Sequence, residues 1–153
     1  MSRPEARLRK VPLSPLVILA RAQWYPLWGT HFAEADFLAS LAAAAPFTRV
    51  VAFRVPAGDL GILEGFANGV ANLTDWDNLT WQVRLNGTAI PMLQSIQGPL
   101  GVMPDPIELS IPLRGGHLIE VMVRNNSGVA ITNPTALILG RTFAPDLPDL
   151  FLE

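Results

Sequence analysis

The chain has 153 residues, a length that fits one domain with a single core. Half of the residues are hydrophobic and 16% are charged, against a usual charged share of about 25%, so we expect other chains to cover part of the surface. The formal net charge of −2 and the absence of cysteine exclude a broadly basic nucleic-acid binder, disulfides and thiolate metal sites.

Residues 1–29 are predicted to form an extended docking arm. Four prolines, at positions 4, 12, 15 and 26, exclude a long helix or a central strand. Polar and proline residues interrupt the apolar stretch of residues 12–28, so neither a membrane span nor a secretory signal peptide is expected. Synthesis is therefore expected in the cytoplasm. Its aromatic residues Trp24, Tyr25 and Trp28 are the predicted anchors on a neighbouring chain, because buried aromatic side chains dominate interface energies.

Residues 30–45 are predicted to form one helix, so that residues 30–46 connect the arm to the main domain. Thr30 is a candidate N-cap, Glu34 and Asp36 lie in the early turns that the helix dipole favours, and Pro46 ends the segment. The apolar residues match a 3.6-residue period only in part.

Residues 47–143 are predicted to form an antiparallel β-sandwich of seven or eight strands, similar to a jelly roll. Short apolar segments alternate with turn residues at intervals of about 8–15, as is typical of such folds. The Asn86-Gly87 and Gly115-Gly116 pairs indicate tight hairpin turns. The predicted strands are residues 48–55, 61–67, 80–85, 88–93, 107–113, 117–124, 129–132 and 135–142.

Residues 144–153 are predicted to form a second docking arm, with Leu150, Phe151 and Leu152 as its anchors. Prolines prevent central strand pairing, and the segment is too apolar to remain solvated. This end is acidic through Asp146, Asp149 and Glu153, whereas basic residues dominate the first ten positions, so a head-to-tail contact between subunits is electrostatically favourable. The basic residues near the N-terminus could also contact nucleic acid, but a docking arm or a solvated tail is the preferred interpretation.

No catalytic, metal-binding or cofactor-binding motif occurs in the sequence, and we expect neither enzyme activity nor a cofactor. The two histidines, His31 and His117, are interpreted as surface or capping residues. Glu64 and Glu120 could act as the paired carboxylates of a glycosidase, but nothing in the sequence brings them together.

The segment Asp75-Trp76-Asp77-Asn78 leaves two alternatives open beside a simple turn. Its oxygen atoms could bind calcium, although the spacing differs from that of an EF-hand, and Trp76 with Trp81 could stack on a sugar. Four Asn-x-Ser/Thr sequences, beginning at Asn72, Asn78, Asn86 and Asn125, are interpreted as turn chemistry rather than as glycosylation sites.

Several short segments resemble the small β-sandwich virion proteins of tailed bacteriophages, such as head decoration, head-fibre and neck components. These segments are residues 55–58, 61–66, 81–87, 90–91, 98–101, 121–125 and 139–140. The resemblance implies a protein present in many copies, often trimeric, that extended termini attach to a capsid lattice or vertex.

The sequence therefore predicts a virion structural protein, most specifically a capsid decoration protein on the capsid surface. Its expected partners are the major capsid protein or other virion subunits and further copies of itself, with a trimer favoured, and neither a membrane nor a specific nucleic acid. The alternative is a carbohydrate-binding module at a phage fibre tip or cell surface that uses Trp76 and Trp81.

Overall fold

The computed structural model describes residues 29–144, which form antiparallel β-sheets with little helix. The first sheet contains, in spatial order, β1 (Thr30–Phe37), β10 (Thr135–Phe143), β4 (Leu60–Gly69) and β7 (Ile107–Arg114). The second contains β3 (Thr48–Arg54), β8 (Leu118–Asn125), β5 (Leu79–Leu85) and β6 (Thr88–Ala89). A small third sheet pairs β2 (Ser40–Leu41) with β9 (Ile131–Thr132), and two 3₁₀ helices, η1 (Leu73–Asn78) and η2 (Pro91–Leu93), lie in loops.

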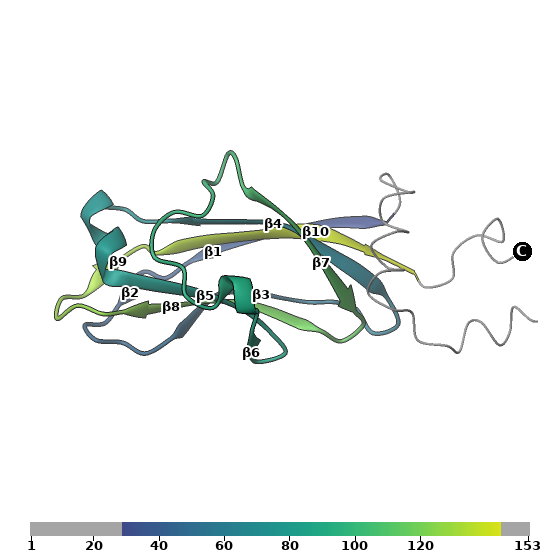
Figure 1. Cartoon of the computed structure of the whole chain (residues 1–153), viewed down its shortest axis with the longest axis horizontal. Helices are drawn as coiled ribbons and strands as arrows, with labels where there is room; N and C mark the ends of the chain where they lie inside the picture. The colour runs from purple at the N-terminus through teal and green to yellow at the C-terminus, as the bar shows by residue number, and fades with distance from the viewer. Residues whose placement is uncertain (1–28, 145–153) are drawn as a thin grey trace, which may run out of the picture.

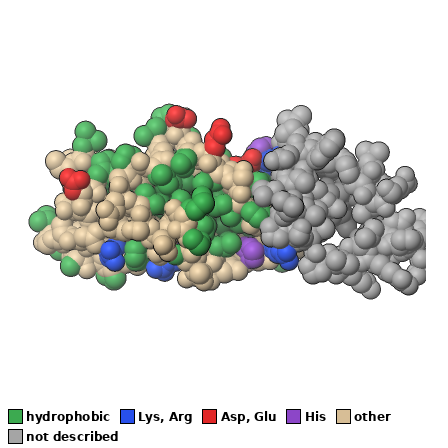
Figure 2. Space-filling view, in the orientation of Figure 1, with side chains coloured by type: hydrophobic (Ala, Val, Ile, Leu, Met, Phe, Trp, Pro, Cys, Tyr) green, Lys and Arg blue, Asp and Glu red, His purple; other side chains and the backbone are tan. Residues whose placement is uncertain are grey.

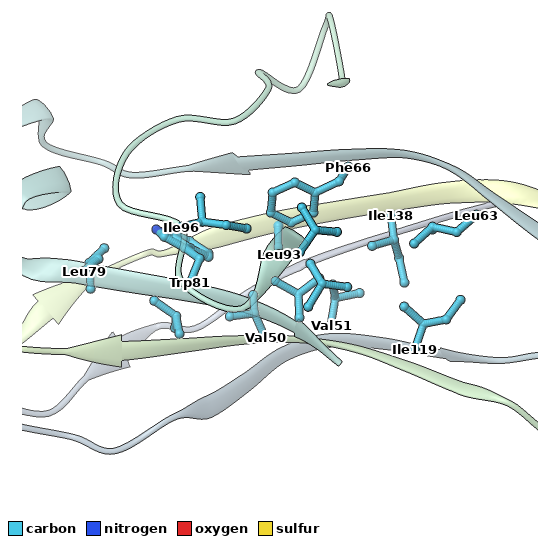
Figure 3. Packing of buried hydrophobic residues seen from close by; sticks show 14 of the residues in the cluster. Val50, Val51, Leu63, Phe66, Leu79, Trp81, Leu93, Ile96, Ile119 and Ile138 are labelled. Atoms are coloured by element: carbon cyan, nitrogen blue, oxygen red, sulfur yellow. The ribbon is translucent and has the colours of Figure 1, made fainter. Parts of the chain in front are cut away.

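The two four-stranded sheets stack face to face in a β-sandwich-like arrangement (Figure 1). Alternate residues of each strand point between the sheets, as the two-residue period of a strand requires. The first sheet contributes Leu63, Phe66 and Ile138 to the core, and the second contributes Trp81 and Ile119 (Figure 3). All five side chains are fully buried, so one continuous core joins the layers.

The alternating patterns of the sequence correspond to the long strands. Strands β5, β7 and β8 lie where period-two alternation predicts them, and β10 covers the last predicted strand. The predicted hairpin turn at Asn86-Gly87 is present, with positive φ angles of 52° and 80°. Strand formation after this turn is shorter than predicted, because Pro91 begins η2 where the sequence pattern continues a strand.

The predicted helix over residues 30–45 is wrong. Residues 30–37 form β1, and all eight pair with β10. Phe32 is the one buried side chain of β1, and its ring stacks on Phe53 of β3 at a centroid distance of 4.0 Å. Backbone pairing and this aromatic contact outweigh the helix propensity of the alanines, several of which occupy an exposed loop instead. The sheets therefore begin at residue 30 rather than at residue 47.

No helix of the described part of the chain combines the length and the apolar character that crossing a membrane requires.

Candidate functional site

The predicted anchor residues of both arms, Trp24, Tyr25, Trp28, Leu150, Phe151 and Leu152, lie outside the described residues. Two surfaces of the described domain remain as candidate interaction sites. One is an end of the domain formed by loops, and the other is the outer face of the second sheet.

The loop end consists of residues 38–47, 70–78 and 126–134, which connect strands at one end of the domain (Figure 1). Large apolar side chains are exposed on or beside these loops: Phe37 by 57%, Leu73 by 83% and Val129 by 71%. Three exposed alanines, at positions 42–44, add to this apolar surface. Exposed apolar groups gathered on adjacent loops are typical of a surface that contacts another molecule.

Asn125, at the end of β8, holds two loops of the loop end together. Its buried amide nitrogen donates to the carbonyl oxygens of Ala42 at 3.0 Å and Val129 at 2.8 Å, and lies 3.4 Å from that of Leu41. Its amide oxygen accepts from the Ser127 backbone N–H at 2.9 Å. Because one side chain satisfies groups from both loops, the loop end is pre-organised rather than loosely arranged.

The loop between β4 and β5 and the start of β5 join the same structure through hydrogen bonds from Asn126. The Asn126 N–H donates to the Asn78 carbonyl oxygen at 2.8 Å, and the Asn126 amide donates to the Thr80 hydroxyl at 2.8 Å. All three loops are therefore linked by hydrogen bonds.

The outer face of the second sheet carries four arginines, and we name it the arginine face. Ile119, Val121 and Val123 of β8 point into the core, so the alternate residues Glu120 and Arg124 point outward. Arg84 of β5 pairs with Glu120, and Arg49 and Arg54 of β3 pair with Met122 and Leu118, the other outward-pointing residues of β8. In the view of Figure 2, most visible basic side chains lie along the lower edge of the domain and most visible acidic ones along the upper edge.

The charges of the described domain are strongly segregated. The arginine face combines four arginines with one carboxylate, that of Glu120, which pairs with Arg49 at 3.6 Å. The rest of the described residues contain two arginines, Arg114 and Arg141, against eight carboxylates. These carboxylates are Glu34, Asp36, Asp59, Glu64, Asp75, Asp77, Asp105 and Glu108.

The sequence interpretation missed this face, although a signal was present. Thr80, Gln82 and Arg84 alternate with Trp81, Val83 and Leu85, which assigns Arg84 to the solvent side of its strand. The same test on β8 assigns Arg124 to that side. Which strands are neighbours is a long-range property, however, and local alternation does not reveal it.

The residues that suggested catalysis are dispersed. Glu64 accepts from Arg141 Nε at 2.8 Å on the first sheet, whereas Glu120 lies on the arginine face, so the two carboxylates do not form a pair. The His117 Nδ1 atom accepts from the Arg114 backbone N–H at 3.1 Å within a turn, and His31 is exposed on β1. No group of three or more potential metal ligands occurs within residues 29–144.

The tryptophans of the proposed sugar site have different environments. Trp81 has no exposed surface and belongs to the core, so its ring is inaccessible to a sugar. Trp76 is half-buried in η1, with its ring 6.1 Å from that of Trp81 and inclined by 45°. Of the four Asn-x-Ser/Thr positions, Asn125 is 2% exposed and makes the buried hydrogen bonds described above.

Comparison with protein-family models and with curated proteins gives no match for this chain.

Proposed function

We propose that the domain is a jelly roll. Without the short strands β2 and β9, eight strands remain, which can be counted from first to eighth along the chain. In this count, the neighbouring strands of the first sheet are the first, eighth, third and sixth. The second sheet has the order second, seventh, fourth, fifth. This alternation between two sheets supports the assignment, because it is the order that two interlocked Greek keys produce.

We propose further that the protein is a virion structural protein of the capsid decoration type. Jelly rolls are frequent in viral capsids and lectins, so the fold alone is an associational argument. The apolar and proline-rich character of residues 1–29 and 144–153 provides the second argument, because such segments gain stability when another chain covers them.

The observation that carries this proposal is the common exit of the two chain ends. Thr30 pairs with Thr142 in the first sheet, so both flanking segments leave the domain at the same place. The loop end lies at the opposite end of the domain (Figure 1). This polarity suits a subunit that is attached at one end and presents its loops at the other.

Attachment in a lattice would strengthen weak contacts. A tethered segment has an effective concentration on the order of millimolar, and a partner that binds only the assembled state stabilises that state by mass action. A trimer with the major capsid protein as its partner is the assembly that we propose.

Cosedimentation with empty capsid shells tests the proposal. The triple variant Trp24→Ala, Tyr25→Ala, Trp28→Ala should lose attachment, because it removes the aromatic anchors of the first arm. Replacing Arg21 and Gln23 by alanine in the same arm is the control and should retain attachment. Unchanged attachment of the triple variant would exclude this arm as the docking element.

A carbohydrate-binding module is the second candidate function. The partial exposure of Trp76 favours it, because this residue lies at the loop end with Asp75 and Asp77 as its sequence neighbours, and an aromatic face with nearby carboxylates suits contact with a sugar. A glycan array should then show binding that Trp76→Ala abolishes. Absence of binding to the wild-type chain would remove this candidate.

A further inference from the structure

Two arginines of the arginine face share one aromatic ring. The guanidinium carbons of Arg84 and Arg124 lie 5.5 Å and 5.0 Å from the centroid of the Phe47 ring. The Nε atom of Arg84 donates to Gln82 Oε1 at 2.6 Å, and the Nε atom of Arg124 donates to Asn126 Oδ1 at 2.8 Å. We name Phe47, Arg84 and Arg124 the arginine pair site.

Neither arginine forms an ion pair with a described carboxylate. Arg84 lies directly across from Glu120 in the sheet register, but the carboxylate of Glu120 pairs with Arg49 instead. The hydrogen bonds through Nε and the contacts with Phe47 fix both guanidiniums, while their terminal nitrogens remain available. Two positioned guanidiniums are suited to carboxylate recognition, because each presents a planar fork of donors.

We propose that the arginine pair site binds residues 145–153 of a second copy of this chain. This inference rests on the proposed function, in which the C-terminal arm docks on a neighbouring subunit, and it names the surface that receives the arm.

The composition of the segment complements the site. Residues 145–153 contain Asp146, Asp149 and Glu153 and no basic residue. Their apolar residues match the partly exposed ring of Phe47, which lies against both arginines. Charged and apolar complementarity together favour a peptide over a simple anion.

The spacing of Asp146 and Asp149 is compatible with the separation of the two guanidiniums. Leu147 precedes a proline, which favours extended backbone there. In polyproline II geometry three residues complete one turn, so Asp146 and Asp149 would point to the same side, roughly 9 Å apart. The two guanidinium carbons are separated by no more than the sum of their distances to the Phe47 centroid, so one such segment can reach both.

A second copy is favoured over the chain's own segment. Phe47 and Arg124 lie toward the loop end, whereas Phe143 ends β10 at the opposite end of the domain. Asp146 follows Phe143 by only three residues, which span roughly 10 Å when fully extended. The part of β8 that leads from Leu118, at the Phe143 end, to Arg124 is six residues and roughly 20 Å long.

A nucleic acid is disfavoured by the charge around the site. Glu120 lies on the same face, and the described residues outside this face carry an excess of carboxylates. A polyanion that tracks many phosphates would meet this acidic surface, whereas a short acidic peptide would not.

The test uses the full-length protein and a fluorescent synthetic peptide of residues 144–153. Anisotropy titration should show binding that weakens at least about tenfold in the Arg84→Gln, Arg124→Gln double variant, because both charge-assisted contacts are lost. The control Ala33→Glu, Ser110→Glu changes the net charge equally at exposed positions of the first sheet and should leave affinity unchanged. Thermal unfolding of each variant verifies folding.

Charge exchange makes the test specific. A peptide with Asp146→Arg and Asp149→Arg should fail to bind the wild-type chain and should bind the Arg84→Glu, Arg124→Glu variant. Sedimentation velocity should show that the wild-type chain self-associates and that deletion of residues 145–153 weakens this association at least about tenfold.

Three results would overturn the inference. The first is equal peptide affinity for the wild-type chain and the Arg84→Gln, Arg124→Gln variant, including no binding to either. The second is loss of binding of a labelled single-stranded oligonucleotide in that variant while peptide binding is unchanged, which would assign the site to nucleic acid. The third is a wild-type chain that stays monomeric while deletion of residues 145–153 raises peptide affinity, which would assign the site to the chain's own segment. The shell-attachment experiment with the Trp24, Tyr25 and Trp28 variant tests the proposed function separately, so failure of the inference and failure of the proposed function can be told apart.

Discussion

At the scale of single residues, Asn125 is the most informative position of the loop end. Replacing it by alanine removes the buried amide that donates to the partly buried carbonyl oxygens of Ala42 and Val129 and accepts from Ser127. We expect the free energy of unfolding to fall by about 1–3 kcal/mol, because several hydrogen bonds are lost together and each contributes about 1 kcal/mol. Urea denaturation measures this loss.

The matched control is Asn72→Ala. Asn72 is exposed at the start of η1, and its side chain forms no capping hydrogen bond. Its replacement should change stability by less than about 0.5 kcal/mol. Similar losses for both variants would contradict the organising role of Asn125.

Gly140 is required by close packing rather than by an unusual φ angle. A Cβ atom there would collide with the carbonyl oxygen of Ile62 and would lie 2.8 Å from the Phe32 ring. Because the first obstacle is backbone of the adjacent strand, Gly140→Ala should destabilise the fold by about 1–3 kcal/mol. Gly69→Ala in β4, where the nearest atom is 3.9 Å away, should cost less in the same denaturation experiment.

At the scale of elements, β1 shows where reading the sequence succeeds and fails. Alternation in β5, β7 and β8 is visible because apolar and polar residues separate cleanly on their two faces. β1 is an edge strand with one buried side chain, so its sequence contains almost no two-residue period. Its acidic residues and the following alanines then favour a helix locally, and only pairing with the distant β10 makes it a strand.

The single buried side chain of β1 should therefore determine whether this strand remains attached. Phe32→Ala removes the ring that stacks on Phe53 and should lower the free energy of unfolding by about 3 kcal/mol. Hydrogen exchange should show faster exchange of the β1 amides than of the β8 amides in this variant. Phe37→Ala changes the same residue type in the same strand at a site 57% exposed and should have little effect.

At the scale of the whole molecule, a mostly β domain and its principal hairpin turns could be predicted from the sequence, whereas the candidate sites could not. The arginine face requires that β3, β8 and β5 be neighbours, and the loop end requires that three distant loops meet. Both depend on sheet order, which local periodicity does not contain. The segment Asp75–Asn78 suggested a calcium or sugar site because its polar residues are adjacent in sequence. Adjacency in sequence alone does not create a binding site.

The domain should fold without residues 1–28. The hydrophobic core described in the structure extends from Phe32 to Ile138, so deletion of residues 1–28 leaves every one of its members in place. We expect this deletion variant to unfold in one cooperative transition in urea and to have lost attachment to capsid shells. Deletion of residues 1–37 also removes β1 and the Phe32–Phe53 contact and exposes the edge of β10, so it should aggregate or unfold at markedly lower urea concentration. If the shorter deletion alone already prevented folding, residues 1–28 would be part of the folded unit and their assignment as a docking arm would be wrong.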